Sequence, residues 1–545
     1  MKRRHFIKNI SAASAGAVML GGYPVRLLAG NSKLKSLAAT GNNDNVLVLV
    51  QLHGGNDALN TLIPLDQYNL YYNYRPNIAI SDSGPRRYIP VDNSLPAADQ
   101  VGLHPDMIGF KELYDAGKAT IVQNVGYENM NLSHFRGRDI MFMGGDSGDY
   151  FHSGWMGRFL DVEYPGYPDA YPDANMPDPI GIELGGAMSL AFHRENGIPI
   201  GLNIYNPDEF YQLISNVGVD LPIAFPDSHA GDELRYLMEF ELMSNKYAGR
   251  LKNVYDSGTN TSGVIYPETY PRIAPDGFLR NPLSGQLRLI ARLLSGGIKT
   301  RIFLCRIGGF DTHGQQVEQY DSSLGAHAAL LYHLSSAIKA FHDDLDAQGL
   351  EEKVITMTFT EFGRRVYSNA SYGTDHGTAT PVFLFGSSLA GGVIGHNPDL
   401  DNLNGGNLRF SIDYRQVYAA VVQDWFGASD EAVQAAKFDS WVDKKVDLFG
   451  VTGLSDYKSE NPLRFEINPN PATEYFTVRF YVADPENVRL TMLDSSGKTI
   501  CTLIDEKKAF GYSQDSFNVN GLAKGNYILM IKAGNCTVSK KLIIY

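Results

Sequence analysis

Four short apolar runs occur in the first 360 residues, each nearly continuous in hydrophobic character. They are "NVLVLVQL" (45–52), "ATIVQNV" (119–125), "RIFLCRI" (301–307) and "KVITMTF" (353–359). A parallel sheet covered by helices on both faces requires strands of this kind, because both sides of every strand are buried. We therefore predict four buried strands of one parallel sheet.

Amphipathic patterns with helical spacing lie between these runs, at residues 106–117, 233–255, 283–296 and 324–347. Strands alternating with helices indicate an α/β domain with helices on both faces of the sheet, and we place it at residues 45–450. Residues 161–230 are rich in Pro, Tyr, Gly and Asp, and we expect an irregular insertion there that covers one end of the domain.

The pattern changes near residue 455. Short alternating strands follow, such as "YFTVRFYV" and "NYILMIKAG", and they are joined by Asn-Pro and Ser-Ser-Gly turns. Alternation with frequent turns is typical of a small antiparallel β-sandwich. We predict a linker at 451–464 and an all-β sandwich at 465–545, for which a generic carbohydrate-binding or immunoglobulin-like module is the alternative.

The first thirty residues have the features of an export signal rather than of a folded element. Arg3 and Arg4 precede the small apolar run "ISAASAGAVMLGG", which is too short and too rich in Gly and Ala to span a membrane. A charged segment with adjacent arginines followed by such a run resembles a twin-arginine signal. The expected partner is the twin-arginine translocase, with passage through the periplasm in a folded state.

Charge and cysteine content exclude several classes of function. The net charge of −13 argues against broad binding to nucleic acid or anionic membranes, both of which need a dense basic surface. The three cysteines include no C-x-x-C, so neither a disulfide scaffold nor a thiolate zinc site is expected. Whether Cys501 and Cys536 pair stays open.

Polar residues follow each of the four predicted strands. In a parallel sheet, functional groups collect beyond the carboxyl ends of the strands. Asp57 follows the first strand, either as a metal ligand or as the cap of the next helix. Ser133 follows the second, either as a nucleophile at a helix N-terminus or as an ordinary N-cap. Asn131, His134 and Arg136 are placed to orient an anion there.

The third and fourth strands add acids and imidazoles. Asp311 and His313 follow the third strand and can face one ion, whereas we assign packing or surface roles to His327 and His333 on the following helix. The fourth strand leads into "TEFGRRVYSNASYGTDHGTATP", which contains Glu361, Arg364, Asp375 and His376. If the next apolar run, "VFLF", is antiparallel to its neighbours, this whole loop stays at the same edge of the sheet, and all these groups converge.

The C-terminal block resembles the sorting domain of type IX secretion substrates. The resemblance rests on "INPNPATEYFTV", "LDSSGKTI", "LAKGNYILMIKAG" and "SKKLIIY" and covers about the last 80 residues. It implies the type IX secretion machinery as a partner and a location at the cell surface or outside the cell. A twin-arginine signal departs from this pattern, because such substrates more often resemble clients of the general secretory pathway.

Residues 45–450 resemble a large family of exported bacterial proteins described as sulfatase-like or as a domain of unknown function. The motifs are "LHGGNDALNTLIP", "NLSHFRGRD", "GWMGRFLD", "GGFDTHGQQ" and "TEFGRRVYSNASYGTDHGTATPVFLFG". The family is related to the alkaline phosphatase superfamily, which has a doubly wound, mostly parallel sheet, two metals and a Ser, Thr or formylglycine nucleophile. The resemblance implies this fold.

The resemblance also implies roles for individual residues. Asp57 matches the first-strand metal ligand, Ser133 the nucleophile, and Asp311 with His313 the ligands of one metal. The segment around His376 is similar to the superfamily's late His ligand. Glu361-Phe362 stands where relatives have Asp-His, so one imidazole is missing unless His376 or His134 replaces it. No C-x-P-x-R or S-x-P-x-R occurs, which excludes formylglycine chemistry.

Two functions follow from these observations. The first is an exported hydrolase or transferase of phosphate or sulfate esters on small molecules or glycans. Ser133 would attack, Arg136 or Arg364 would hold the anion, and one or two divalent cations (zinc, calcium or magnesium) would be bound by the predicted metal ligands Asp57, Asp311, His313, Glu361, Asp375 and His376. The second is a non-catalytic surface protein that binds glycans or anions in a degenerate site. A factor for export or maturation of a partner is a third reading.

Overall fold

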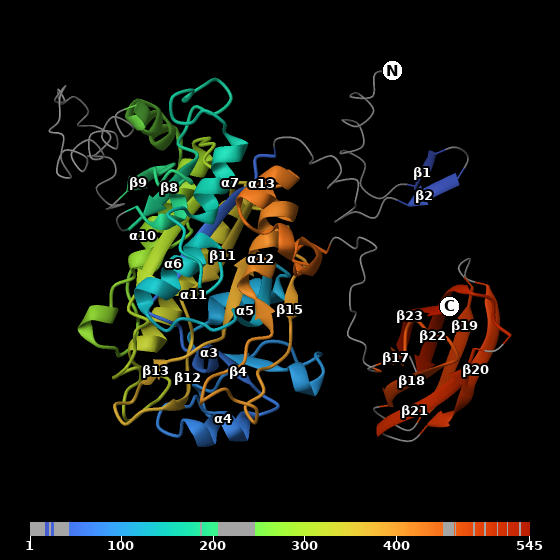
Figure 1. Cartoon of the computed structure of the whole chain (residues 1–545). Helices are drawn as coiled ribbons and strands as arrows, with labels where there is room; N and C mark the ends of the chain where they lie inside the picture. Colours follow the sequence, from blue (N-terminus) through green and yellow to red (C-terminus); the bar gives the residue numbers. More distant parts are fainter. Residues whose placement is uncertain are drawn as a thin grey trace. The chain divides into compact units, whose positions relative to one another are not determined.

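The computed structural model describes residues 17–20, 23–26, 43–185, 188–204, 246–450 and, with short gaps, most of 463–544. The chain divides into two compact units, residues 1–451 and 452–545, whose elements are labelled in Figure 1. Among the described residues, no helix combines the length and the apolar character needed to cross a bilayer.

One large sheet forms the centre of the first unit. In the described residues it has nine strands in the order β15-β7-β14-β11-β3-β10-β8-β9, with β16 paired to β7. β14 is antiparallel to β11 and β7, and the other neighbours are parallel. The strands are β3 (Val46–His53), β7 (Ala119–Gly126), β8 (Gly181–Leu184), β9 (Leu202–Ile204), β10 (Ile302–Gly308), β11 (Val354–Phe359), β14 (Thr380–Phe385), β15 (Gly392–Ile394) and β16 (Ile412–Asp413).

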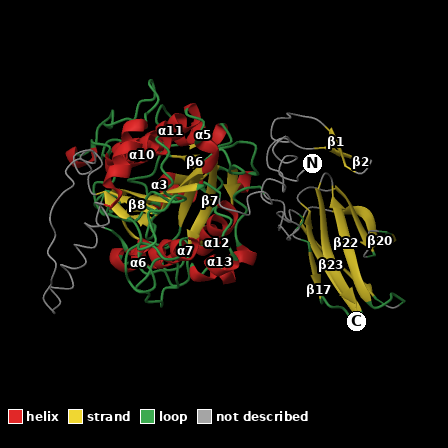
Figure 2. Ribbon diagram, turned by 90° about the horizontal axis from the view of Figure 1, so that it is seen from above, coloured by secondary structure: helices red, strands yellow, loops and turns green. Residues whose placement is uncertain are grey.

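The four apolar runs are the strands β3, β7, β10 and β11, as predicted. Every residue of β11 is buried, and so is every residue of β3 except His53 at its end. Helices cover both faces and explain this burial. Figure 2 shows α5 (Ile108–Asp115), α10 (Pro282–Ser295) and α11 (Ala326–Ala347) on one face, and α6 (His134–Met143), α7 (Trp155–Glu163), α12 (Tyr414–Ala420) and α13 (Asp430–Ala435) on the other. The predicted doubly wound α/β class is confirmed.

The predicted helices at 106–117, 283–296 and 324–347 correspond to α5, α10 and α11. The local sequence explains where α10 begins: the side chain of Asn281 accepts from the backbone N–H groups of Leu283 and Ser284, and Pro282 occupies the first turn. The predicted helix at 233–255 lies partly outside the described residues, and residues 246–257 are helical.

The prediction of a purely irregular segment at 161–230 was wrong in one respect. β8 and β9 lie within it and extend the central sheet at one edge by parallel pairing. They have four and three residues, which is too short for a periodic pattern to stand out in the sequence. Residues 205–230 of this segment lie outside the described residues.

Smaller elements surround the carboxyl edge of the sheet. β12 (Arg364–Ser368) and β13 (Thr374–His376) form a hairpin within the loop 360–379, and β4 (Leu62–Pro64), β5 (Ile89–Pro90) and β6 (Val101–Leu103) form a three-stranded sheet. The short helices and turns are α3 (Ala58–Thr61), α4 (Tyr68–Tyr74), η1 (Ala97–Asp99), η2 (Leu190–Phe192), η4 (Asp276–Phe278), η5 (Glu351–Lys353), η6 (Val421–Trp425, π-helical) and η7 (Asp439–Lys444).

The second unit is the predicted antiparallel β-sandwich. Its two sheets have the orders β17-β18-β21 and β20-β19-β22-β23. Alternate residues of β18, among them Phe476, Val478 and Phe480, are fully buried in its core. The strands are β17 (Glu466–Asn468), β18 (Tyr475–Val482), β19 (Glu486–Leu493), β20 (Thr499–Lys508), β21 (Gly511–Asn518), β22 (Gly525–Ala533) and β23 (Cys536–Ile544).

Three predictions concern residues at the margins of the described chain. Arg3 and Arg4 of the predicted export signal lie outside the described residues, which include only the paired strands β1 (Ala17–Leu20) and β2 (Tyr23–Arg26) from that region. The predicted linker lies outside them too, except for Leu463. Cys501 is a free thiol on β20, and the side chain of Cys536, at the start of β23, lies outside the described residues.

Candidate metal centre

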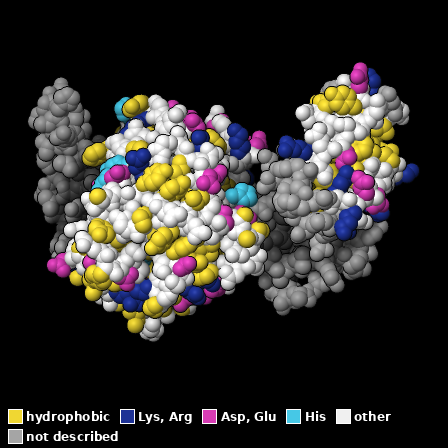
Figure 3. Space-filling view, turned by 90° about the horizontal axis from the view of Figure 1, so that it is seen from below, with side chains coloured by type: hydrophobic (Ala, Val, Ile, Leu, Met, Phe, Trp, Pro, Cys, Tyr) yellow, Lys and Arg dark blue, Asp and Glu magenta, His cyan; other side chains and the backbone are white. Residues whose placement is uncertain are grey.

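The carboxyl ends of β3, β7, β10 and β11 lie at one edge of the sheet, because these strands run in the same direction. The antiparallel strand β14 begins at this edge, so the loop before it stays there, as predicted for the run "VFLF". Figure 3 views the molecule from the side of β12, β13 and α4, and histidines lie there beside acidic and basic side chains.

Two glycines allow the strand ends to approach closely. A Cβ on Gly54, which has a φ of +125°, would lie 2.3 Å from the backbone nitrogen of Asp311. A Cβ on Gly377 would lie 2.2 Å from the carbonyl carbon of Arg364, the residue opposite His376 in the β12–β13 hairpin. Any larger residue would push Asp311 and His376 away from the strand ends.

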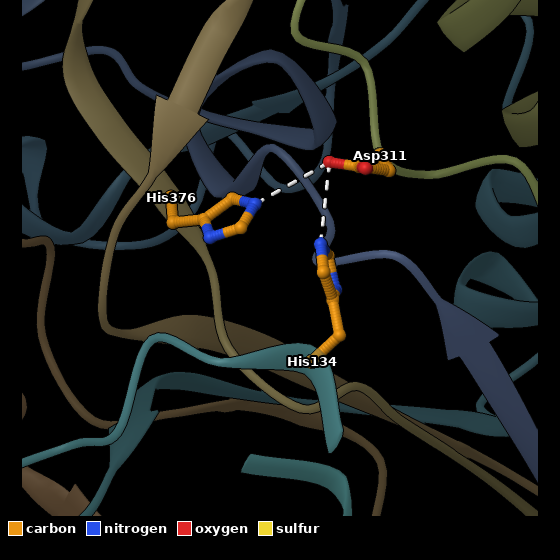
Figure 4. A group of neighbouring side chains, drawn as sticks. All are labelled: His134, Asp311 and His376. Atoms are coloured by element: carbon orange, nitrogen blue, oxygen red, sulfur yellow. Dashed lines mark ion pairs between the residues drawn. The ribbon is translucent and has the colours of Figure 1, made fainter. Parts of the chain in front are cut away.

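Three side chains from distant parts of the sequence meet at this edge: His134 at the start of α6, Asp311 after β10 and His376 at the end of β13. The Nε2 atoms of His134 and His376 each lie 3.4 Å from Oδ1 of Asp311, as Figure 4 shows. One ligand atom from each residue lies within 4.8 Å of those of the other two. His313 joins them, with its Nε2 3.2 Å from Asp311 Oδ1 and 2.9 Å from His376 Nε2.

Each of the three imidazoles is fixed through its other nitrogen. Nδ1 of His134 lies 2.9 Å from Oε1 of Glu361, and Nδ1 of His376 lies 2.8 Å from the carbonyl oxygen of Leu132. Nδ1 of His313 lies 3.2 Å from Oδ1 of Asp375. All three partners are acceptors, so each Nδ1 is placed to donate, and in a neutral ring this arrangement leaves the Nε2 lone pair for a ligand. In most metal sites, a metal-binding histidine makes such a contact through the ring nitrogen that does not bind the metal.

The charges around Asp311 keep its carboxylate ionised. Burial alone would raise the pKa of Asp311, but the hydrogen bond and the charge of Arg364, at 2.7 Å, hold it below its usual value. The hydrogen bond with Glu361 raises the pKa of His134, whereas burial lowers the pKa of His376. The side chains of Asp311 and His313 are almost half exposed and those of His134 and His376 are about one quarter exposed, so the cluster lies at the protein surface.

Glu361 and Asp375, both predicted as metal ligands, lie behind the imidazoles. Glu361 is fully buried, and its Oε1 accepts from the backbone N–H of Gly54 at 2.8 Å as well as contacting His134. Asp375 contacts His313 and accepts from the Nδ2 of Asn369 at 3.3 Å. Both carboxylates therefore orient histidines, and His134, predicted to orient an anion, takes the position of a ligand.

The structure does not bring Asp57 into this cluster, contrary to its prediction as a metal ligand. Both of its carboxylate oxygens lie 2.8 Å from Nη1 of Arg75, and Gln316 donates to Oδ2 at 2.6 Å. It also accepts from the backbone N–H of Asn60 as the N-cap of α3, which is the alternative considered for it. Burial would raise the pKa of Asp57, but the charge of Arg75 keeps it below the usual value.

Both arginines predicted to hold an anion donate to backbone carbonyl oxygens. Arg364 is buried and donates to the carbonyl oxygens of Gly55 and Phe310, at 2.8 and 3.0 Å, as well as to Asp311. Arg136 donates to the carbonyl oxygens of Ser147 and Asp149 and stacks on the ring of Tyr150 at 3.9 Å. Their guanidinium groups bind the protein's own backbone.

Ser133 is exposed and is the N-cap of α6 by its backbone, but its side chain makes no capping hydrogen bond. The side chain of Asn131 instead accepts from the backbone N–H of Ser133 at 2.9 Å. The nucleophile role of Ser133 stays a prediction.

His327 and His333 are buried in α11 and contact Asn56 and the Phe278 carbonyl oxygen, so their assignment to packing is confirmed.

Three residues near the site were not identified from the sequence: Arg75 and Gln316, the partners of Asp57, and His53 at the end of β3. The ring of His53 stacks on that of His134 with centroids 6.4 Å apart, and burial lowers its pKa. His53 lies at the end of a strand and directly precedes Gly54 and Gly55, and this position could have identified it as a residue near the site. Nothing in the sequence pairs Arg75 with Asp57.

Comparison with known families identifies two domains. Residues 246–435 match the family described as "Protein of unknown function (DUF1501)", and residues 466–545 match the "Secretion system C-terminal sorting domain". The chain thus has a DUF1501 domain followed by a type IX sorting domain. The sorting domain implies an interaction with the type IX secretion machinery and secretion to the cell surface or the extracellular space. Among curated proteins, none matches the sequence.

Solved structures resemble the chain at low identity. Ps i-CgsB in complex with k-i-k-neocarrahexaose is 11% identical with a TM-score of 0.33, covering 80% of this chain and 83% of its own. The alkaline phosphatase from the Antarctic bacterium TAB5 is 11% identical with a TM-score of 0.26, covering 73% and 99%. A protein in the alkaline phosphatase superfamily from Vibrio parahaemolyticus is 10% identical with a TM-score of 0.32, covering 91% and 83%.

Proposed function

We propose that this protein is a secreted, metal-dependent hydrolase of phosphate or sulfate esters. The observation that carries the proposal is the orientation of His134, His313 and His376, whose Nε2 atoms converge on Asp311 while their Nδ1 atoms are held by acceptors. Three nitrogen donors and one carboxylate oxygen are a donor set that suits zinc among common divalent ions.

The fit of these residues to a cation follows from electrostatics. His313 Nε2 and His376 Nε2 lie 2.9 Å apart, so when both rings carry their single proton on Nδ1 the two lone pairs repel each other. Nε2 of His134 is buried and has no hydrogen-bond donor among the described residues. One cation between these atoms and Asp311 removes the repulsion. When bound, a divalent ion of this kind polarises an ester oxygen and neutralises negative charge.

Ser133 supplies the proposed nucleophile. It directly precedes His134, its side chain is exposed, and its hydroxyl is not used to cap α6. A hydroxyl at the N-terminus of a ten-residue helix also lies near unpaired backbone N–H groups, which favour an anionic ester. Glu361 and Asp375 position His134 and His313, and Arg364 keeps Asp311 ionised.

The test combines metal analysis with turnover. Purified protein is expected to retain about one divalent ion per chain, as structural and catalytic sites of this donor set do, and to lose it in the His376→Ala variant. Wild type is then assayed with aryl phosphates and aryl sulfates, and Ser133→Ala is expected to bind metal normally and to lose turnover. Metal-free protein whose turnover equals that of Ser133→Ala would refute the proposal.

A second function is favoured by the two arginines. Arg364 is buried and bound to backbone carbonyl oxygens, so it is not available to hold an ester group, and Arg136 also binds backbone carbonyl oxygens through its Nη2. A non-catalytic protein that binds anions or glycans needs no such clamp at the metal. This function predicts saturable glycan binding that survives chelation, together with no turnover of any ester in the panel.

We also propose the route of export. Arg3 and Arg4 precede a short apolar run, so the twin-arginine translocase would deliver the folded chain to the periplasm before the sorting domain acts. Replacing both arginines with lysine is expected to leave the protein in the cytoplasm. Normal secretion of this variant would indicate a different translocase.

A further inference from the structure

A cleft lies on α4, the short helix that packs against β4 and β12 (Figure 1). Its volume is about 590 Å³, within the range of about 300–1,000 Å³ that small-molecule sites occupy. The helix and the loop after it line the cleft, with Tyr68, Asn69, Tyr72 and Asn73 from α4 and Ser81, Asp82 and Ser83 from the loop. None of these residues belongs to the histidine cluster, and we call this separate site the tyrosine cleft.

The helical spacing of α4 separates a buried side from the side that lines the tyrosine cleft. Residues four apart lie one above the other on a helix, so Tyr68 and Tyr72 form one row and Asn69 and Asn73 form the next. Tyr71 lies on the other side and is fully buried in the hydrophobic core beneath α4, whereas Tyr72 is 47% exposed. The side that faces the cleft therefore presents an aromatic ring beside two amides.

The aromatic part of the cleft is held in place by the protein itself. The ring of Tyr68 contacts the rings of three other tyrosines, with centroids 5.7 Å from Tyr71, 5.7 Å from Tyr88 and 6.3 Å from Tyr72. The hydroxyl of Tyr68 donates to the carbonyl oxygen of Ile80 at 2.8 Å, which ties α4 to the start of the loop. Because Tyr72 packs against a fixed ring, a ligand that stacks on it has little side-chain motion to suppress.

The polar part of the lining suits hydroxyl groups better than anions. The side chains of both asparagines and of the three loop residues are exposed, and the loop is closed by the N–H of Ser83, which donates to Oγ of Ser81 at 3.1 Å. Amides and hydroxyls both donate and accept hydrogen bonds, as the hydroxyls of a sugar do. Asp82 is the single charged residue of the lining, and its negative charge opposes the binding of sulfate, phosphate or nucleic acid.

We propose that the tyrosine cleft binds a neutral polysaccharide. The C–H groups on the face of a sugar ring carry partial positive charge and stack on the negative face of an aromatic ring, here that of Tyr72. The sugar hydroxyls then bind the amides of Asn69 and Asn73 on one side and the loop residues on the other. This binding goes beyond the proposed function, because it requires neither a metal nor turnover of an ester.

The test measures binding of the full chain to five probes: a linear β-glucan, a galactomannan, an arabinoxylan, dextran sulfate and a polyproline peptide. The first three are neutral polysaccharides, and the peptide tests whether the tyrosines bind an extended chain of another kind. We expect saturable binding to at least one neutral polysaccharide. Tyr72→Ala should weaken it by about tenfold or more, whereas Tyr72→Phe, which keeps the ring, should bind within about threefold of wild type.

Two further variants accompany this pair. Asn69→Ala combined with Asn73→Ala removes both amides and should weaken binding by about fivefold or more. Tyr475→Ala removes an exposed tyrosine of the second unit and should bind as wild type does.

The outcomes separate the tyrosine cleft from the metal centre. His376→Ala is expected to bind polysaccharide as wild type does, and Tyr72→Ala is expected to keep the metal content and the urea midpoint of wild type. The proposal is overturned if none of the three neutral polysaccharides binds, or if Tyr72→Ala binds as tightly as wild type. It is equally overturned if dextran sulfate or polyproline binds more tightly than all three, or if His376→Ala or Tyr475→Ala weakens binding as much as Tyr72→Ala.

Discussion

Two groups of polar side chains lie just past the end of β3, and each contains an aspartate and histidine. In the first group, Asp57 is surrounded by Arg75 and Gln316, with His327 close to Asn56. In the second, Asp311 lies among the Nε2 atoms of His134, His313 and His376. The first group is buried, whereas Asp311 and His313 are almost half exposed.

Both aspartates are paired with an arginine, and the two groups differ in whether the surrounding side chains also find partners within the protein. Arg75 balances the charge of Asp57 within the protein, and both carboxylate oxygens are satisfied. At Asp311 one oxygen accepts from Arg364, and the Nε2 atoms of three imidazoles face the same oxygen. Nε2 of His134 has no hydrogen-bond partner among the described residues. A buried acid needs a partner from the chain, whereas an exposed set of acceptors can be completed by an ion from solvent. The same residue types are thus arranged for stability in one group and, in our proposal, for metal binding in the other.

The largest expected effect comes from breaking the buried pair. Arg75→Met leaves Asp57 charged and unpaired, so the free energy of unfolding of the α/β unit should fall by about 3–5 kcal/mol. Urea denaturation of the full chain measures it, with exposed Arg409→Met as the control. An equal, small change in both variants would contradict a structural role for the pair.

A buried acid with weaker compensation gives a pH-dependent effect. Glu183 lies 3.6 Å from Arg306, and burial raises its pKa to about 7. The pKa of Glu183 in the folded protein is higher than the usual 4.5, so its protonated form stabilises the fold. This contribution to the free energy of unfolding is fully present below pH 4.5 and is lost as the pH rises through 7. Glu183→Gln should therefore gain stability relative to wild type by on the order of 3 kcal/mol over this range. A stability difference between Glu183→Gln and wild type that stays constant with pH would contradict this prediction.

A smaller effect is expected from the carboxylate behind His134. Glu361→Gln weakens the contact that fixes this ring, and zinc affinity should fall by about 10–100-fold while the fold is retained. Competition with a chromophoric chelator measures the affinity. Glu112→Gln, on the exposed surface, is the control. Unchanged affinity in Glu361→Gln would mean that His134 is not a ligand.

The smallest effect on stability is expected at Ser133. Its side chain makes no capping bond, so Ser133→Ala should change the free energy of unfolding by less than about 0.5 kcal/mol. Ser429→Ala provides a matched comparison, because the side chain of Ser429 accepts from the N–H of Ala432 and its loss should cost about 1 kcal/mol. A large loss in Ser133→Ala would show that Ser133 acts as a structural cap.

Much of the fold was predictable, because a strand that is buried on both faces needs apolar residues at nearly every position. The strands β3, β7, β10 and β11 are continuous apolar runs, and their common direction placed Asp311, His313 and His376 at one edge. β8 and β9 were missed, since strands of four and three residues in a segment rich in Pro and Tyr carry no periodic signal.

The site was predictable in its location but not in the role of each residue. Asp57 and Asp311 both follow a strand, and only the fold reveals that Arg75 occupies the space beside Asp57. Glu361 follows β11 directly, but its complete burial behind His134 depends on how α6 packs. Side-chain roles depend on these long-range neighbours, which a strand-end pattern does not specify.

The most direct test of the central claim is anomalous diffraction at the zinc absorption edge from crystals of the protein grown with zinc. We expect a peak about 2.0–2.1 Å from Nε2 of His134 and of His376, and bound also to the Asp311 carboxylate. A peak beside Asp57, or none at the histidines, would contradict the assignment of this cluster as the metal centre.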